Sequence, residues 1–194
     1  MYFEFVKEAA AETEDELAEQ YQALYSNLEK AEQLYWKKPQ QSGMMLRKAA
    51  EKVCRIYNRY YKIGFAEDAL LEAFLCYTGD DSHNAMVSRF LSTVRQEQRD
   101  HLEWLRVWGD ECIFMEANPD EIACSGDKLY LNVKKMMSAM LYVTENMCTK
   151  INHMKFTERQ IFDDSRLPDY PLEEAELQKK AGRKKGLFAT LFRK

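Results

Sequence analysis

The chain has 194 residues, of which 46% are hydrophobic, with few helix breakers: 7 Gly and 4 Pro. It is long enough to bury one core, and long periodic segments favour a single all-helical protein. The five cysteines form no Cys-x-x-Cys pair, which argues against a zinc knuckle or a disulfide framework. With no signal-peptide pattern and no apolar run near roughly 18 residues, we expect a cytoplasmic protein without a membrane span.

Charge divides the chain unevenly. The net charge is −4, but residues 179–194 carry seven Lys and Arg side chains and no acid, so residues 1–178 carry −11. An acidic body is a poor general binder of nucleic acid, and the basic segment acts separately from it. We therefore predict a helical bundle over 1–154, an acidic, partly extended connection over 155–178 and a basic tail over 179–194.

Apolar periodicity predicts the first helices in chain order. The first dozen residues form a short helix or strap. A capping box that begins at Thr13 starts a long amphipathic helix, which ends before Pro39. A second helix runs from about 41 to 63 with Gly64 as its C-cap, and a short, nearly all-apolar helix follows over 66–77.

The stretch from Val87 to Phe114 reads as one amphipathic helix of about six turns. Ser82 is the expected N-cap, and Gly109 with the following Asp is expected to end the helix. His101 falls on its apolar stripe, and Arg95, Arg99 and Arg106 lie on the neighbouring flank. The stripe consists of Val87, Leu91, Val94, Leu102, Leu105 and Trp108.

An irregular connection of about 17 residues follows Gly109 and leads to a long helix. Asp127 is its expected N-cap, and it ends near His153. Four of its residues are Met, which suits either adaptable core filler or a groove for a partner.

Two segments of these helices resemble a known family. Residues 31–35, Pro39 and 45–51 resemble the "AE-x-L-Y … P … LR-x-x-x-E" signature of a domain at the N-terminus of type I restriction endonuclease R subunits, which also occurs as stand-alone bacterial proteins. Residues 3–6 are similar to the start of that family, and residues 105–114 resemble its second signature, "IR-x-x-GN-x-x-x-H". The family belongs to the HEPN-like superfamily of helical bundles, many of which are dimeric, metal-independent ribonucleases. The resemblance therefore implies an all-α, HEPN-like bundle of about five helices and a homodimer.

The second signature departs from the family at two positions. Phe114 stands where the family has His, and Asp110 stands where it has Asn. Phe cannot transfer a proton, so a catalytic role of that His is lost here. Arg95 and His101 keep the Arg–His spacing of the ribonucleases, with His as general acid–base and Arg on the phosphate. On a straight helix the two side chains point about 120° apart. The alternative interpretation is therefore that His101 is a core or interface residue and that Arg95 is solvated.

Arg47 and Glu51 match the first signature. They form either a polar cluster in the bundle with Arg106 and Asp110, or an ordinary surface ion pair that orients the Gly109 turn.

His83 and His153 have no acidic or His partners at ligand spacing, so no metal site is predicted. The chain also lacks a Gly-rich phosphate loop, and no cofactor is expected.

The C-terminal tail combines cations with one apolar helical face and resembles the membrane-targeting sequence of the Min-system cell-division ATPase. The residues that carry this pattern are Lys184, Lys185, Leu187, Phe188, Leu191 and Phe192. Such a segment suits an anionic membrane surface at the inner face of the cell membrane, a protein partner, or docking on its own acidic body.

The resemblance favours a non-enzymatic or degenerate HEPN-like accessory module of a bacterial defence or stress system, recruited to a membrane by its tail. One alternative is a dimeric ribonuclease or toxin that cleaves RNA with Arg95 and His101. Another is a structural adaptor that recruits a protein partner.

Overall fold

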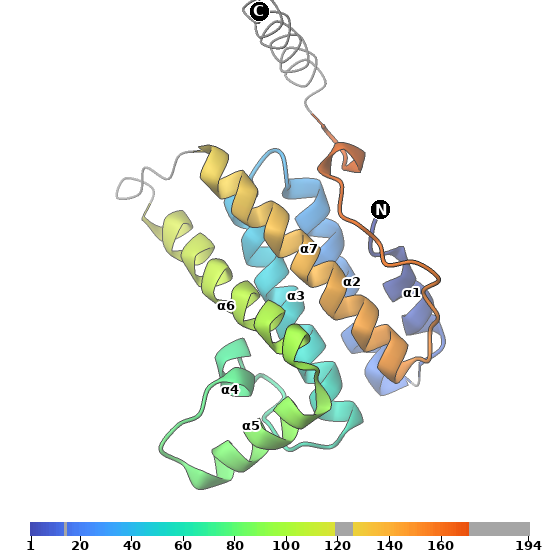
Figure 1. Cartoon of the computed structure of the whole chain (residues 1–194), viewed down its shortest axis with the longest axis vertical. Coiled ribbons are helices and arrows are strands. Elements are labelled where there is room, and N and C mark those ends of the chain that lie inside the picture. The colour runs from blue at the N-terminus through green and yellow to red at the C-terminus, as the bar shows by residue number, and fades with distance from the viewer. Residues whose placement is uncertain (14, 119–125, 171–194) are drawn as a thin grey trace, which may run out of the picture.

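A computed structural model describes residues 1–13, 15–118 and 126–170 of the chain (Figure 1). The described residues form helices and no strands, which confirms the all-α prediction. The helices are α1 (Glu4–Ala11), α2 (Asp15–Leu34), α3 (Pro39–Tyr60), α4 (Leu71–Leu75), α5 (Asp81–Thr93), α6 (Gln96–Ala117) and α7 (Gly126–Ile151), followed by a 3₁₀ turn at Asp164–Arg166.

The four long helices α2, α3, α6 and α7 form the bundle, and α3 packs against each of the other three. Figure 1 shows α6 and α7 side by side and antiparallel, with α4 and α5 at one end of the bundle and α1 beside α2. Residues 155–170, here called the C-terminal strap, run back along the bundle on the side of α1 (Figure 1). None of the described helices is long and apolar enough to cross a membrane.

The core follows the predicted apolar faces closely. Val94 and Leu105 are buried as expected, but Trp108 of the predicted stripe is half-buried. Tyr60, the last residue of α3, is 42% exposed. The four Met side chains of α7 were expected to be either core filler or the lining of a groove for a partner. Met136, Met137, Met140 and Met147 are all fully buried, so they are core filler rather than the lining of an exposed groove.

The predicted helix stop at Gly109 is wrong. Gly109 lies inside α6, which continues to Ala117, so the predicted irregular connection begins only after that residue. Gly in a helix costs about 1 kcal/mol relative to Ala. Here a Cβ at Gly109 would lie 2.5 Å from the Cβ of Arg47 on α3, so the missing side chain lets the two helices approach and the packing offsets the cost.

The predicted single helix through Val94 is also wrong. Val94 and Arg95 are extended and separate α5 from α6. Side chains satisfy the carbonyl groups that the break exposes: Arg99 donates to the carbonyls of Leu91 and Val94, and the Lys150 ammonium donates to the carbonyl of Thr93. The end of α5 is thus capped by side chains of α6 and α7 as well as by its own Ser92 and Thr93 hydroxyls.

Several predicted helix ends shift. The N-cap of α5 is Asp80, whose carboxylate accepts the Ser82 amide at 2.9 Å, rather than Ser82 itself. The short helix is confined to α4, and α3 ends before Gly64, which has a φ of 114°. The Thr13 capping box involves side chains outside those described, although the Thr13 hydroxyl donates to the Ala9 carbonyl at 2.5 Å. The predicted N-cap Asp127 is wrong, because α7 begins at Gly126 and Asp127 is its second residue.

Candidate functional site

A groove of about 730 Å³ lies between α6, α7 and the C-terminal strap, and is called here the α6–α7 groove. Much of its lining is apolar, and two lining side chains are largely open to solvent: Leu131 is 53% exposed and Ile161 is 83% exposed. The groove is also lined by Asp100, His101, Trp104, Lys134, Lys135, Tyr142, Arg159, Gln160 and Phe162.

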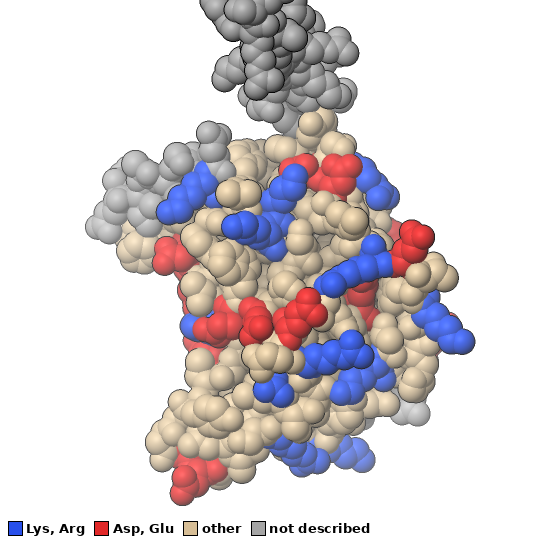
Figure 2. Space-filling model, in the orientation of Figure 1, with Lys and Arg blue, Asp and Glu red and all other residues tan. Residues whose placement is uncertain are grey.

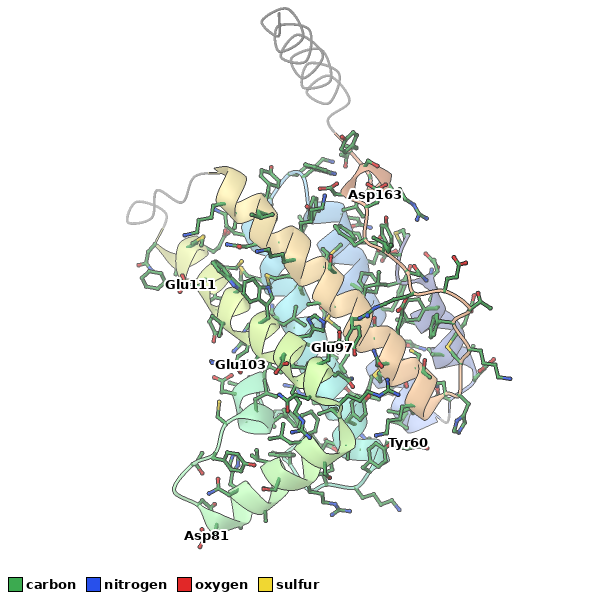
Figure 3. All side chains as sticks on the ribbon, in the orientation of Figure 1. Tyr60, Asp81, Glu97, Glu103, Glu111 and Asp163 are labelled. Carbon is green, nitrogen blue, oxygen red and sulfur yellow. The ribbon has the colours of Figure 1, made fainter. Side chains whose placement is uncertain are left out.

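The first wall of the groove is the face of α6 that carries His101 and Trp104, three positions apart. The His101 ring lies 4.7 Å from the Tyr142 ring of α7, and the Lys135 ammonium lies 5.6 Å from the Trp104 ring centre. The Glu97 carboxylate accepts the Tyr142 hydroxyl at 2.5 Å. Figure 3 places Glu97 on the side of α6 that faces α7, whereas Glu103 and Glu111 lie on the other side of α6. These contacts fix the register of the two helices beside the groove.

The C-terminal strap supplies the second wall. The Arg159 guanidinium lies 3.8 Å from the Tyr142 ring centre, and the Gln160 backbone N–H donates to the Glu145 carboxylate at 3.2 Å. Phe162 is buried with its ring 5.1 Å from that of Tyr2. Because these anchors come from α7 and from the N-terminal end of the chain, the wall exists only in the folded bundle.

The rim of the groove carries charges of both signs. Lys134, Lys135 and Arg159 line it together with Asp100, and the Arg159 guanidinium lies 4.0 Å from the Glu97 carboxylate. Lys134 also pairs with Asp164 of the strap at 3.0 Å, which reduces its charge toward the groove. Figure 2 shows acidic side chains gathered over α6 and basic ones over α7 beside them.

Burial lowers the pKa of His101 below its ordinary value, with Arg159 acting in the same direction and Glu97 against it. Burial and the hydrogen bond to Glu97 raise the pKa of Tyr142. The neutral forms of both groups are therefore favoured at neutral pH.

Of the predicted pair Arg95 and His101, His101 lines this groove and Arg95 does not. Arg95 is exposed and extended at the N-cap of α6, outside the helix on which His101 stands. His101 is half-buried against Tyr142, and the charge of Arg95 lowers the pKa of the same Tyr142. The catalytic role of the two residues stays a prediction.

The second predicted constellation, the Arg47 cluster, lies where α3, α4 and α6 meet. The Arg47 guanidinium contacts three carboxylates: Glu51 at 2.5 Å, Glu72 at 3.1 Å and Asp110 at 2.6 Å. Arg47 is 8% exposed and Glu51 is 7% exposed, so they do not form an ordinary surface pair. The two sequence signatures meet at this point.

Arg106 completes the Arg47 cluster from the solvent side. It donates two hydrogen bonds to Glu103, at 2.6 and 2.9 Å, and lies 3.5 Å from Asp110. The hydrogen bond from Arg106 lowers the pKa of Glu103, and the pKa of Arg106 is raised in turn. Every carboxylate of the cluster has a cationic partner, which suits a structural bridge between helices; any further role stays a prediction.

The other residues considered in the sequence are His83 and the basic tail. His83 contacts the Cys76 carbonyl at 3.2 Å, and within residues 1–13, 15–118 and 126–170 no group of His, Cys, Asp and Glu is arranged to hold a metal. The tail residues Lys184, Lys185, Leu187, Phe188, Leu191 and Phe192 lie outside the described residues.

The sequence prediction missed most of the groove. The α6 wall could have been predicted from the spacing of His101 and Trp104. The other walls could not, because Leu131 stands on the outer side of α7 and residues 159–162 show no helical periodicity. No protein-family model matches the chain, and neither a curated protein nor a solved structure matches it. The HEPN-like resemblance therefore rests on the sequence signatures alone.

Proposed function

We propose that the protein is a non-catalytic, HEPN-like accessory module of a bacterial defence or stress system, and that it binds a partner in the α6–α7 groove. The observation that carries the proposal is the groove itself, which presents exposed Leu131 and Ile161 beside Lys135 and Arg159. An exposed apolar surface with a few charged groups around it is typical of an interaction site.

The loss of catalysis is supported by two residues of the family signatures. Phe114 is 50% exposed on α6 and has no group that transfers a proton. Arg47 is engaged by Glu51, Glu72 and Asp110, so the first signature forms a bridge between helices, which suits a structural role.

The test is cleavage of single-stranded RNA by the purified protein in the presence of a metal chelator. We expect no cleavage above that of a mock preparation. Cleavage that disappears in His101→Ala, with nuclease contamination excluded, would refute the proposal.

The second candidate function is a metal-independent ribonuclease that uses Arg95 and His101, in a homodimer if the family pattern holds. One observation favours it: the break before α6 places Arg95 in extended backbone just before the helix that carries His101. In that case Arg95→Ala and His101→Ala would each abolish cleavage, whereas Arg89→Ala, a matched exposed arginine on α5, would not.

We further propose that the basic tail recruits the bundle to an anionic membrane surface. The seven cations confined to 179–194 and the apolar residues Leu187, Phe188, Leu191 and Phe192 support this proposal, because apolar burial and cation attraction act together at such a surface. We expect salt-sensitive co-sedimentation with vesicles that contain acidic lipid, and much less with neutral vesicles.

The control for the membrane proposal is a chain truncated after Lys180. It should lose vesicle binding and keep its melting curve. Equal binding by the truncated chain would exclude the tail as the anchor, and absence of binding by the full chain would favour the adaptor reading, in which the tail recruits a protein.

A further inference from the structure

The side of α6 that faces away from α7 carries exposed apolar side chains. Val107 and Phe114, seven residues and therefore about two helical turns apart, are 41% and 50% exposed, and Ile113 is 40% exposed. Figure 3 places Glu103 and Glu111 on the same side. Single exposed apolar residues are normal, but three within residues 107–114 form a patch whose burial is favourable. The outer face of α6 is defined here as Glu103, Arg106, Val107, Asp110, Glu111, Ile113 and Phe114.

The charges around this patch are predominantly negative, even after every ion pair is counted. Arg106 and Arg47 pair with Glu103 and Asp110, but neither arginine serves one carboxylate alone. Glu111 is exposed and forms no ion pair with any cation of the described residues. An excess of carboxylates beside apolar side chains attracts a basic, apolar segment and repels an acidic one. In all, five carboxylates stand against three guanidinium groups: Glu51, Glu72, Glu103, Asp110 and Glu111 against Arg47, Arg55 and Arg106.

The C-terminal tail of the same chain has the complementary pattern. Its four bulky apolar residues lie within 187–192, with three cations at 183–185 before them and two at 193–194 after them, and it contains no acid. The distance from Val107 to Phe114 along α6 is about 11 Å. Residues 187–192 would span about 8 Å as a helix and about 17 Å as an extended chain, so the two apolar stretches are of comparable length.

The tail also starts close enough to reach the outer face of α6. The Tyr170 ring lies 5.3 Å from the Trp36 ring, and Asp169 pairs with Lys37 at 2.8 Å, so the strap ends beside the turn between α2 and α3. Just after that turn, Gln41 donates to Glu116 in the last turn of α6 at 2.8 Å. Figure 1 shows the end of the strap and the end of α6 at the same end of the bundle. The 16 residues from 171 to 186 can span up to about 50 Å.

A segment of the same chain has an advantage over any separate basic peptide. A short covalent tether gives an effective concentration on the order of mM. A contact too weak to hold a free peptide therefore becomes occupied within one molecule.

We infer that the outer face of α6 binds the basic tail of its own chain, with the apolar residues of 187–192 on Val107 and Phe114 and the tail cations beside Glu103 and Glu111. Because the same apolar side chains would enter a membrane, a tail bound to α6 is withheld from lipid, and an anionic surface has to compete for it. This regulation rests on the proposed membrane recruitment, whereas the contact between tail and α6 does not.

The experiment is zero-length carbodiimide cross-linking of the full chain at low salt, read by peptide mass spectrometry of the monomer. We expect amide cross-links from Lys184 or Lys185 to Glu103 or Glu111. The double variant Val107→Ser, Phe114→Ser keeps every carboxylate but removes the apolar patch, so the cross-link yield should fall by about fivefold or more. The matched control is Leu131→Ser, because Leu131 is 53% exposed on α7, and it should leave the yield unchanged. Melting curves check that the variants fold.

Vesicle binding tests the regulation. The full chain with Val107→Ser and Phe114→Ser should co-sediment with vesicles of phosphatidylglycerol and phosphatidylcholine about threefold more strongly than wild type, because the tail is released. Absent cross-links, cross-links confined to a dimer, or a yield that ignores the double variant would overturn the binding of the tail to α6. Unchanged vesicle binding by the double variant would overturn the regulation. If the full chain and the double variant both fail to bind vesicles while the cross-links form as expected, the membrane proposal fails and the contact with α6 stands.

Discussion

Replacing Arg47 by Met tests whether the Arg47 cluster holds the bundle together. Met fills the apolar volume of the Arg47 stem, which packs against Gly109, but it removes the charge. The substitution leaves Glu51, whose side chain is 10% exposed, without its partner at 2.5 Å. Glu72 and Asp110, with side chains 47% and 43% exposed, can turn to water instead.

The expected loss in the free energy of unfolding follows from this difference in burial between Glu51 and the other two carboxylates. Breaking a buried ion pair by removing one partner costs about 3–5 kcal/mol, because a charge stays buried without compensation. Arg55 remains 3.9 Å from Glu51, so we expect the lower end, about 3 kcal/mol. Glu72→Gln should cost about 0–1 kcal/mol, as for an exposed pair.

The assay is urea unfolding at neutral pH, with the m-value checked for two-state behaviour. Lys48→Met is the matched control, because Lys48 is an exposed cation on the same helix, and it should change stability by no more than about 0.5 kcal/mol. The double variant Arg47→Met, Glu51→Leu should recover much of the loss, since an apolar replacement of the whole pair leaves no buried charge. A loss below about 1 kcal/mol for Arg47→Met, or a double variant as unstable as the sum of its parts, would refute this account of the cluster.

Two further predictions concern buried positions. Gly109→Ala should destabilise by about 1–3 kcal/mol in thermal unfolding, because its Cβ would crowd Arg47; stabilisation, as helix propensity alone implies, would contradict the close crossing. Burial raises the pKa of Glu32, so the native state binds its proton more tightly than the unfolded chain does, and the contribution of Glu32 to stability falls as pH rises through the raised pKa. The stability of Glu32→Gln relative to wild type should therefore increase from about pH 4 to pH 7; a difference that is flat with pH would show that Glu32 is not perturbed.

Helix content and most core faces could be predicted from sequence, because apolar spacing on one helix is local information. The predicted helix stop at Gly109 was wrong because a glycine can remain inside a helix where its missing side chain lets another helix pack closely. The residue that packs there, Arg47, lies 62 positions earlier in the chain, so local sequence does not show the contact. The break at Val94 was missed for a similar reason. Its exposed carbonyls are satisfied by Arg99 and Lys150, and the Lys150 contact joins residues 57 positions apart.

The same limit separates the two candidate sites. The pairing of Arg47 with Glu51 follows from their four-residue spacing on a helix, and the structure adds burial and the partners from α4 and α6. The groove depends on residues 159–162, which no periodicity places. Their position is set by Phe162 against Tyr2 and by the two hydrogen bonds of 2.8 Å between the Tyr2 hydroxyl and Asp163.

The break before α6 bears on both proposed functions at once. If α5 and α6 were one straight helix, Arg95 and His101 would diverge by about 120°, and a shared site within one chain would be excluded. With Arg95 in extended backbone, that angle no longer constrains its side chain, so the ribonuclease candidate stays open. The same break leaves His101 on a helix that begins at Gln96 and packs on α7, where its ring lies against Tyr142 and forms part of the lining of the α6–α7 groove. Our proposal therefore expects no cleavage by a chain in which the groove is intact, and the RNA-cleavage assay decides between the two candidate functions.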